Sequence, residues 1–336
     1  MNPRWRPLCE PATAIPDGHA VAGSRIVRFA RATDDTDGAT SPAATMPRAV
    51  LDAVTAPRAR LCGLTLDQPR IMGIVNVTPD SFSDGGDRAG VAAALTAARS
   101  MQGLADILDI GGESTRPGAD PVPVAEEIRR VRPVIAAIRD AGITTPISID
   151  TRKAPVAEAA LDAGANMVND VAALEYDPEL GPLCAARDVP VCLMHARGDP
   201  RTMQDAPRYD DALWDVFDRL QALVAGAEAA GIRRRNIIAD PGIGFGKTLA
   251  HNLRILRGMS AYHGLGVPLL VGASRKRFIG TLGPAEAPKD RGPGSLAVAL
   301  HAAGQGAHVI RVHDVAETRQ ALNLWQALNS DEVSRP

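Results

Sequence analysis

Polar residues recur along the chain, each directly after a short run of apolar residues. An apolar run that ends in a polar residue is typical of a buried β-strand whose carboxyl end faces a binding site. One such residue can be a helix cap or a hydrogen-bonded structural side chain. Eight consecutive strand ends that suit anions or heterocycles indicate an enzyme, and they are Asn76, the segment 111–118, Asp150, Asn169-Asp170, Met194-His195, Asp240, Ser274-Arg275-Lys276 and Arg311-Val312-His313-Asp314.

Part of this set suits a phosphate or diphosphate group. Arg311, His313 and the adjacent pair Thr115 and Arg116 offer hydrogen-bond donors and positive charge to phosphate oxygens. Asn76 has an amide oxygen that can serve as a ligand of a hard cation. These residues predict a site for a phosphorylated substrate, with a cation reached through Asn76.

The other members suit a flat heterocycle. Asp150, Asn169, Asp240 and Lys276 combine hydrogen-bond acceptors with donors. A 2-amino-4-oxo-pyrimidine edge presents an NH₂ group beside an N–H group, and one carboxylate can accept from both. A lysine can donate to the adjoining oxo group, so a heterocycle of this kind is a candidate ligand.

The segment 242–248, Gly-Ile-Gly-Phe-Gly-Lys-Thr, superficially suggests a phosphate-binding loop. The Walker pattern needs a glycine where Pro241 stands, and the third glycine comes one residue early for the dinucleotide fingerprint. We expect instead a flexible turn that lets Asp240 and Phe245 face a ligand. The histidines and cysteines show no spacing typical of a metal site.

These residues need a scaffold that brings eight strand ends together. Helical periodicity follows each of the apolar runs, which lie at residues 71–75, 107–110, 146–149, 167–168, 189–194, 237–239, 268–271 and 308–312. Eight strand–helix units over about 260 residues predict an α/β fold, the (β/α)₈ TIM barrel. A doubly wound open sheet is the alternative that the pattern leaves open.

The chain divides into three segments. Residues 1–47 mix Pro, Gly, Ala, Asp and Arg without a sustained period, and we expect a poorly ordered N-terminal extension. Residues 48–68 contain two short apolar runs that could form a short hairpin at the edge of the main domain. Residues 69–330 are predicted to form the barrel.

The composition excludes several classes of function. Acids and bases are interspersed with a net charge of −2, so no basic surface for nucleic acid is predicted. No apolar run is long enough to span a membrane, and the start lacks the order of a secretory signal. The four cysteines are interpreted as buried or idle thiols of a reducing compartment. We therefore expect a cytoplasmic enzyme that acts on small-molecule substrates.

The motifs that carry these residues resemble those of dihydropteroate synthases between about residues 65 and 330. Two long signatures resemble those of the family, at residues 71–86 (IMGIVNVTPDSFSDGG) and 109–118 (DIGGESTRPG). Shorter motifs follow in the family's order at residues 148–151, 169–171, 194–195, 240–247, 274–276 and 311–314. The segment before the first signature, about 65 residues, is longer than in a compact bacterial member, and it shows no signature of a second folate enzyme.

The resemblance implies a role for each matching residue. The pterin would be held by Asp150, Asn169, Met194, Asp240, Phe245 and Lys276, and the diphosphate by Asn76, Thr115, Arg311 and His313. The p-aminobenzoate would contact Phe82, Pro117, Phe245 and Ser274, and Mg²⁺ would be reached through Asn76. The residues expected to take part in catalysis are Asp84, Asp150, Lys276 and Arg116.

The resemblance also implies a reaction. Diphosphate would leave the pterin methylene carbon, assisted by Mg²⁺ and cationic residues, and the amine of p-aminobenzoate would attack the resulting cation. Sulfonamides, which mimic p-aminobenzoate, should inhibit, and a homodimer is expected. The competing hypotheses are a pterin-binding paralogue or scaffold without synthase activity and a pterin-dependent methyltransferase domain.

Overall fold

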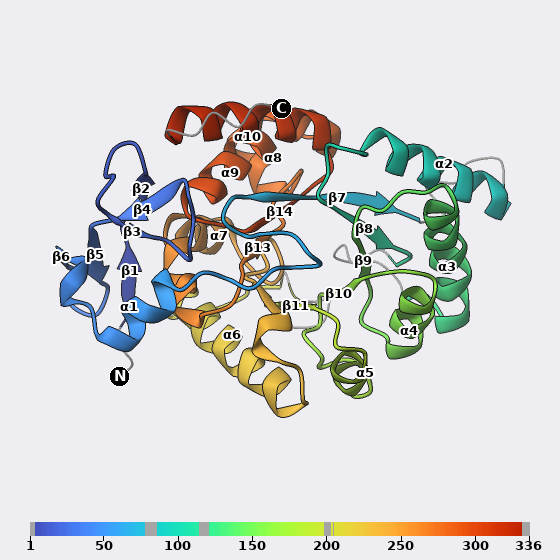
Figure 1. The fold of residues 1–336 in the computed structure, drawn as a ribbon, viewed down its shortest axis with the longest axis horizontal. Coiled ribbons are helices and arrows are strands. Elements are labelled where there is room, and N and C mark those ends of the chain that lie inside the picture. Colours follow the sequence, from blue (N-terminus) through green and yellow to red (C-terminus); the bar gives the residue numbers. More distant parts are fainter. Residues whose placement is uncertain (1–3, 78–85, 114–120, 198–202, 204, 331–336) are drawn as a thin grey trace.

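A parallel eight-stranded barrel forms the main body of the protein (Figure 1). The computed structural model describes residues 4–77, 86–113, 121–197, 203 and 205–330. The strands follow the order β12-β11-β10-β9-β8-β7-β14-β13. They are β7 (Arg70–Asn76), β8 (Ile107–Gly111), β9 (Ile147–Asp150), β10 (Met167–Asp170), β11 (Val191–Met194), β12 (Ile237–Asp240), β13 (Leu270–Val271) and β14 (Val309–Val312).

The strand order decides between the two predicted folds. The first barrel strand, β7, pairs with the last, β14, and a parallel bridge between Ala239 and Leu269 joins β12 to the start of β13. A doubly wound sheet has open edges and a reversal of strand order, and this cyclic pairing has neither. The TIM barrel prediction is confirmed, and the open-sheet alternative is wrong.

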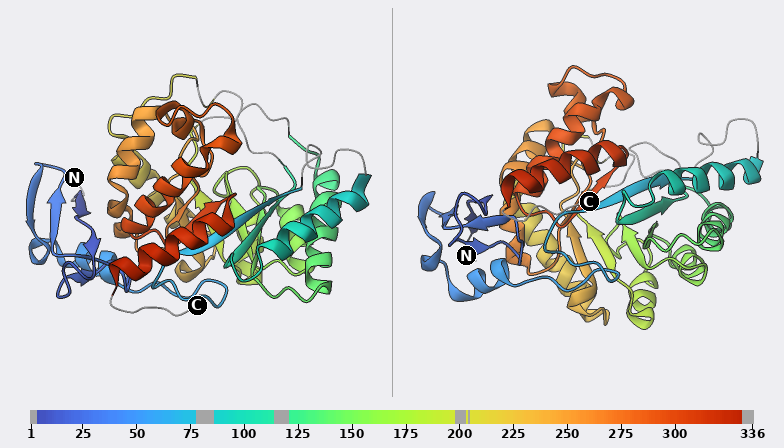
Figure 2. Two further views of the ribbon diagram at one scale, coloured as in Figure 1. Left: turned by 90° about the horizontal axis from the view of Figure 1, so that it is seen from above. Right: turned by 45° about the horizontal axis from the view of Figure 1, so that its top comes forward.

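Helices surround the strands and connect each to the next (Figures 1 and 2). Their apolar faces pack against the outside of the sheet, as expected for crossover connections between parallel strands. They are α2 (Gly86–Ser100), α3 (Val124–Asp140), α4 (Ala154–Asp162), α5 (Leu180–Arg187), α6 (Ala212–Ala229), α7 (Leu249–Arg257), α9 (Gly292–Gly304) and α10 (Val315–Asn329), with the short α8 (Arg277–Leu282) before α9.

The inside of the barrel is apolar toward the amino-terminal ends of the strands. Each strand contributes alternate side chains to this interior because side chains along a strand alternate between its two faces. Leu61 and Leu66, from the segment before β7, close this end of the barrel. The buried interior residues contributed by strands are Met72, Ile107, Met167, Cys192, Ile238, Leu270 and Val309. The buried polar side chains of Asp150, Asn169 and Asp240 lie instead at or next to the carboxyl ends of their strands.

The N-terminal segment is folded, so the prediction of a poorly ordered extension is wrong for the residues described within 1–47. Two three-stranded antiparallel sheets form, one from β1 (Trp5–Pro7), β5 (Arg31–Asp34) and β6 (Ala39–Pro42), the other from β2 (Glu10–Pro11), β3 (His19–Ala20) and β4 (Val27–Phe29). Val21, Ile26 and Phe29 belong to one buried hydrophobic cluster of this segment. Strands of two to four residues are too short to show a period in the sequence.

The hairpin predicted over residues 48–68 is also wrong. Residues Arg48–Thr55 form helix α1 instead, and a single antiparallel bridge between Leu61 and Leu64 is the only strand-like pairing described in this range. Val50, Leu51 and Val54 have helical spacing, which places all three against the N-terminal cluster. Together, the described residues up to 55 form a small module, here called the N-terminal module.

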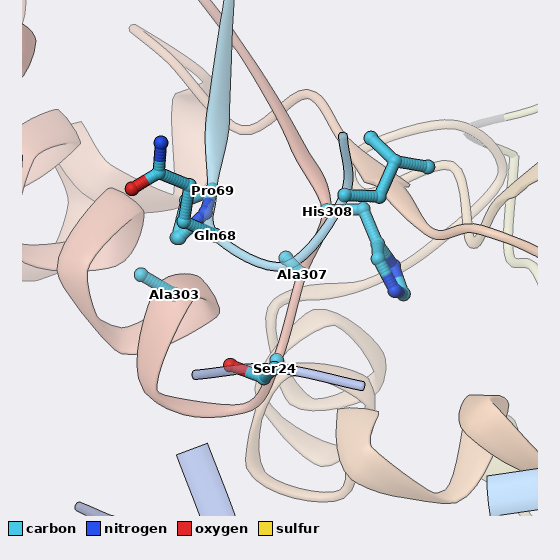
Figure 3. A pocket seen from close by; sticks show the side chains of 8 residues that line it. Ser24, Gln68, Pro69, Ala303, Ala307 and His308 are labelled. Carbon is cyan, nitrogen blue, oxygen red and sulfur yellow. The ribbon is translucent and has the colours of Figure 1, made fainter. Parts of the chain in front are cut away.

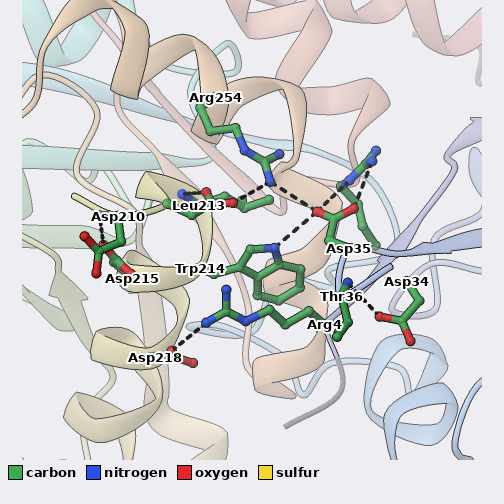
Figure 4. A network of polar contacts seen from close by, with 12 residues as sticks. Arg4, Asp34, Asp35, Thr36, Asp210, Leu213, Trp214, Asp215, Asp218 and Arg254 are labelled. Carbon is green, nitrogen blue, oxygen red and sulfur yellow. Dashed lines mark hydrogen bonds and ion pairs between the residues drawn. The ribbon is translucent and has the colours of Figure 1, made fainter. Parts of the chain in front are cut away.

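The N-terminal module docks on the side of the barrel near α6 and α7 (Figures 2 and 4). The carboxylate of Asp35 accepts hydrogen bonds from Arg6 within the module at 3.2 Å, from Trp214 of α6 at 3.1 Å and from Arg254 of α7 at 3.2 Å. Ser260, before β13, donates to the carbonyl of Pro7 at 2.7 Å. Asp35 is therefore the polar centre of the interface.

A small pocket lies where the N-terminal module meets the amino-terminal ends of β7 and β14 (Figure 3). Ser24 of the module and Gln68, Pro69 and His308 of the barrel are among its lining residues, which include no lysine, arginine or carboxylate. The pocket is at the opposite end of the barrel from the polar strand ends. Among the helices that the structure describes, none has the length and apolarity required to cross a membrane.

Candidate active site

The carboxyl ends of the strands bring the predicted heterocycle residues together. In the parallel register Asp150 of β9 lies beside Asn169 of β10, and Met194 of β11 lies beside Asp240 of β12. All four side chains are buried. Burial of two carboxylates and an amide is unfavourable without partners, so this end of the barrel is built for polar contacts.

Arg311 connects two carboxylates across the barrel. Its Nε donates to Oδ2 of Asp109 at 2.6 Å, and its Nη2 donates to Oδ2 of Asp150 at 2.7 Å. Sequence reasoning assigned Arg311 to the diphosphate and Asp150 to the pterin, and the structure brings the two side chains into direct contact. The guanidinium has five N–H donors, so this pairing leaves donors for a ligand.

Asp109 is a functional candidate that sequence reasoning missed. It is fully buried in β8, and its Oδ2 accepts from Asn169 at 3.2 Å as well as from Arg311. Asp109 therefore links a residue assigned to the pterin with one assigned to the diphosphate. The signal in the sequence is a carboxylate within the apolar run Ile107–Ile110, because a charge inside a buried strand requires a partner.

Burial and neighbouring acids raise the pKa of Asp150 to about 7. Burial contributes most; the positive charge of Arg311 opposes it, and the negative charges of Asp109, Glu127 and Asp170 add to it. The Oδ1 atoms of Asp109 and Asp150 are buried and accept no hydrogen bond from the described residues. A buried carboxylate oxygen of this kind favours a ligand that brings N–H donors.

Asp240, Lys276 and Phe245 form the opposite side of the site. The Nζ of Lys276 lies 4.4 Å from the centre of the Phe245 ring and donates to the carbonyl of Ile243. Burial lowers the pKa of Lys276 to about 8, and the nearby charge of Asp240 opposes that effect. Burial raises the pKa of Asp240, which the charge of Lys276 partly offsets. The two groups stabilise each other's charged form.

Ser274 and His313 are also brought together. The hydroxyl of Ser274 lies 3.0 Å from Nδ1 of His313 and accepts from its backbone N–H at 3.3 Å. Ser274 follows β13 and His313 follows β14, so the contact joins neighbouring strand ends. A residue predicted to contact p-aminobenzoate is thus paired with one predicted to contact diphosphate.

Asn76 ends β7 with an exposed side chain, which leaves its amide oxygen accessible. Within the described part of the chain, no group of three or more His, Cys, Asp or Glu side chains could hold a metal ion. Mg²⁺ keeps several waters and is commonly bound by one or two protein oxygens together with substrate phosphates. A lone amide oxygen therefore fits Mg²⁺ that arrives with a diphosphate.

Comparison with known proteins identifies the family. Residues 72–313 match the family described as pterin binding enzyme. The chain is 47% identical over 269 residues to the dihydropteroate synthase of Escherichia coli (strain K12), with 78% of this chain and 93% of that protein covered. The chain belongs to the dihydropteroate synthase family.

Two further members of the family are similar over the same region. The probable bifunctional folylpolyglutamate synthase/dihydropteroate synthase of Haloferax volcanii is 49% identical over 264 residues, and the chain spans only 31% of its length. The structure of Xanthomonas albilineans dihydropteroate synthase with 4-aminobenzoic acid is 49% identical, with a TM-score of 0.76, and the similarity covers 83% of this chain and 99% of that one.

Five residues that the dihydropteroate synthase resemblance places at the site lie outside the described residues. They are Phe82, Asp84, Thr115, Arg116 and Pro117. Both flanks of the segment 114–120 are described, however. Oε2 of Glu113 accepts from the backbone N–H of Val122 at 3.1 Å, and Nζ of Lys153 donates to Glu113 and to the Val122 carbonyl. These contacts hold the two flanks, Glu113 and Val122, next to each other.

Lys153 belongs to a buried polar cluster behind the site. Its Nζ also donates to Oε2 of Glu127 at 2.6 Å, and Glu127 accepts from the hydroxyl of Thr151 at 2.7 Å. Arg152 donates to Glu113 at 2.9 Å. Thr151, Arg152 and Lys153 directly follow Asp150, so the cluster ties the flanks of segment 114–120 to the strand end that carries Asp150.

Proposed function

We propose that the protein condenses 6-hydroxymethyl-7,8-dihydropterin diphosphate with p-aminobenzoate to give 7,8-dihydropteroate and diphosphate. The observation that carries the proposal is the set formed by the buried Asp150, Asn169 and Asp240 and the partly buried Lys276, beside Arg311. This set offers carboxylate acceptors and cationic donors to a heterocycle on one side and to a diphosphate on the other. Membership of the dihydropteroate synthase family supports the same substrates.

The pterin is bound through its pyrimidine edge. A carboxylate accepts from the 2-amino group and the neighbouring ring N–H, and Lys276 donates to the oxo group. Asn169, held by Asp109, supplies both a donor and an acceptor. Met194 at the end of β11 is buried beside Asp240 and packs on the ring. The unpartnered oxygen of Asp150 gains a donor when the pterin binds.

The diphosphate is held by Asn76, Arg311 and His313, together with Thr115. Arg311 neutralises negative charge that grows as the diphosphate departs. Mg²⁺, reached through Asn76, would supply further positive charge to the leaving group when bound. Arg116 is the second cation that the sequence offers for this step.

The bond from the methylene carbon to the diphosphate oxygen breaks with its electron pair leaving on the oxygen. The resulting cation is delocalised into the pterin ring and stabilised by anionic Asp150, with Asp84 as the second carboxylate. The amine of p-aminobenzoate then attacks the methylene carbon and loses a proton, so no enzyme nucleophile is needed. The p-aminobenzoate lies near Phe245 and Ser274, with Phe82 and Pro117 completing its contacts.

Release of diphosphate in the presence of the dihydropterin diphosphate and Mg²⁺ tests the proposal. We expect release that depends on p-aminobenzoate and is accompanied by dihydropteroate, and we expect a sulfonamide to inhibit it. Binding of the pterin without either product would identify a non-catalytic paralogue and contradict the proposal. A homodimer and a cytoplasmic location stay predictions, which sedimentation and cell fractionation can check.

A further inference from the structure

Lys247 is a buried lysine in the glycine-rich segment that follows β12; burial lowers the pKa of its amine, and the negative charge of Asp240 opposes that effect. Its Nζ lies 2.9 Å from Nδ1 of His195 and 2.9 Å from the carbonyl oxygen of Gly242. It also lies 3.0 Å from the carbonyl of Phe245 and 3.2 Å from that of His195. An ammonium group has three N–H donors, and these four acceptors occupy all of them. Lys247 therefore binds the backbone of its own segment and has no donor left for a substrate anion.

The polarity of this segment is opposite to that of a phosphate-binding loop. Phosphate-binding loops direct backbone N–H groups at the anion, whereas here two carbonyls converge on a cation. The N–H groups of Gly242 and Gly244 are committed to Oδ1 of Asp240 and Oδ1 of Asn252, both at 2.7 Å. The resemblance of residues 242–248 to a phosphate loop is thus explained by a carbonyl cage around Lys247.

Two glycines make the cage possible. Gly242 and Gly246 have φ values of 63° and 61°, a left-handed conformation that side chains disfavour. A Cβ atom at Gly242 would overlap the carbonyl oxygen of His195, and one at Gly246 would overlap that of Arg197. The segment can therefore press against residues 195–197 and turn its carbonyls inward toward Lys247.

The caged segment supports two residues of the site. Ile243 accepts a hydrogen bond from Lys276, and the ring of Phe245 lies under the same ammonium group. Asp240 is bonded through its side chain to Gly242 and through its carbonyl to the N–H of His195 at 2.8 Å. A change in the shape of the segment would displace Lys276, Phe245 and Asp240 together.

We propose that Lys247 is a positioning residue, which holds segment 241–247 in the shape that places Lys276 and Phe245 for pterin binding. This inference rests on the proposed function, since the ligand is the pterin. As an ammonium group Lys247 can only donate to Nδ1 of His195, and this contact then places the proton of the neutral imidazole on Nε2. Burial and the charge of Lys247 lower the pKa of His195 to about 2, in agreement with a neutral ring.

The test compares Lys247→Met with a matched control, Arg139→Met. Arg139 also holds loop carbonyls, those of Ile143, Thr145 and Gly164, but these precede β9 and β10 at the opposite end of the barrel. The affinity for 6-hydroxymethyl-7,8-dihydropterin is measured by calorimetry well below each variant's unfolding temperature. We expect Lys247→Met to weaken binding by about tenfold and Arg139→Met to leave it within about twofold.

Equal weakening in both variants, or unchanged affinity in Lys247→Met, would overturn the proposal. If Lys247→Met does not fold, Lys247→Gln takes its place, because its amide retains two of the three donors and binding should weaken less. Nitrogen NMR shifts of the His195 ring provide a readout independent of the ligand. If Lys247→Met leaves these shifts unaltered, the contact itself is refuted. If the shifts change but the unsubstituted protein binds no pterin, only the proposed function is refuted.

Discussion

Arg311 and Asp109 form an ion pair at the floor of the site, with 2.6 Å between Nε and Oδ2 and with Asp109 fully buried. The pair joins the last barrel strand to the second, across β7. Because Arg311 also contacts Asp150, the charge of Asp109 acts on the residue proposed to stabilise the cation. The electrostatics of the site are therefore set partly by a side chain that lies beneath it.

Substitution of Asp109 by Asn should move the acidic limb of the pH–rate profile to lower pH. Asp109 raises the pKa of Asp150 by charge repulsion, and its removal also lets Arg311 interact more strongly with Asp150. We expect a loss of about 1.5–3 kcal/mol in unfolding free energy as well, because a charge-assisted hydrogen bond is weakened. The rate measured from pH 5 to 9 gives the shift.

Ser148→Ala is the control for this prediction. Ser148 lies beside Asp109 in the register of β8 and β9, and its buried hydroxyl has no partner among the described residues. The substitution removes a polar atom from the same level of the barrel without changing its charge. An acidic limb that moves equally in both variants would contradict an electrostatic role for Asp109.

The rate at low substrate concentration should rise as the pH increases through about 7. The pKa of Asp150 is raised to about 7 in the free protein, so its anionic form, which stabilises the cation, is lost below that pH. The profile of kcat/KM reports groups of the free enzyme and is the measurement to make. In Asp150→Asn the remaining activity should not show this rise through about pH 7. A rise that persists in the variant would show that another group titrates there.

Activity should fall again as the pH increases through about 8. The pKa of Lys276 is lowered to about 8, so the cation that donates to the pterin oxo group is lost above that pH. The affinity for the pterin alcohol, titrated between pH 7 and 9.5, should decrease over this range. Lys276→Met should bind the pterin alcohol weakly, and its affinity should not change with pH over the same range. An affinity that still decreases with pH in this variant would exclude Lys276 as the group responsible.

The strand ends were predictable because each lies where an apolar run meets a polar residue, a boundary that the sequence shows directly. Asp109 was not found because it lies inside its run, where its role depends on Arg311, about 200 residues further along the chain. The strands of the N-terminal module were not predicted for a different reason. Their short apolar stretches are buried only because Trp5, Phe29 and Val54 collect in one cluster.

Glu113→Gln should slow condensation while leaving the pterin affinity intact. Glu113 joins the two flanks of the segment that carries Thr115 and Arg116, through Val122 and Lys153, and in the described structure it has no hydrogen bond to a residue assigned to the pterin. A small misplacement of catalytic groups can reduce kcat by about tenfold or more. Rapid-quench measurement of product formation, compared with equilibrium binding, separates the two effects.

Glu126→Gln is the matched control for Glu113→Gln. Glu126 forms an exposed ion pair with Arg129 and a half-buried one with Arg130 on α3, so the same chemical change is made in a largely surface ion pair nearby. Exposed pairs contribute about 0–1 kcal/mol, and the rate should not change. A rate reduced equally in both variants would show that the effect of Glu113 is not specific to its position.

Asp35→Ala should loosen the N-terminal module without slowing catalysis. The substitution leaves Trp214, Arg6 and Arg254 without their shared acceptor, and we expect a loss of about 2–3 kcal/mol in the free energy of unfolding. Asp34→Ala is the control, because Asp34 accepts only from the N–H of Thr36 in its own turn among the bonds drawn in Figure 4. Chemical denaturation and limited proteolysis compare the two variants.

The proteolysis pattern carries the decisive information in this comparison. If Asp35 anchors the module to the barrel, cleavage in Asp35→Ala should begin within the first 55 residues and spare the barrel, because the module has its own small core and few other polar links to α6 and α7. The strand ends that bear Asp150, Asp240 and Arg311 belong to the barrel alone, so turnover should persist after such cleavage. Loss of turnover in step with cleavage would instead mean that the module supports the active site through α6 and α7.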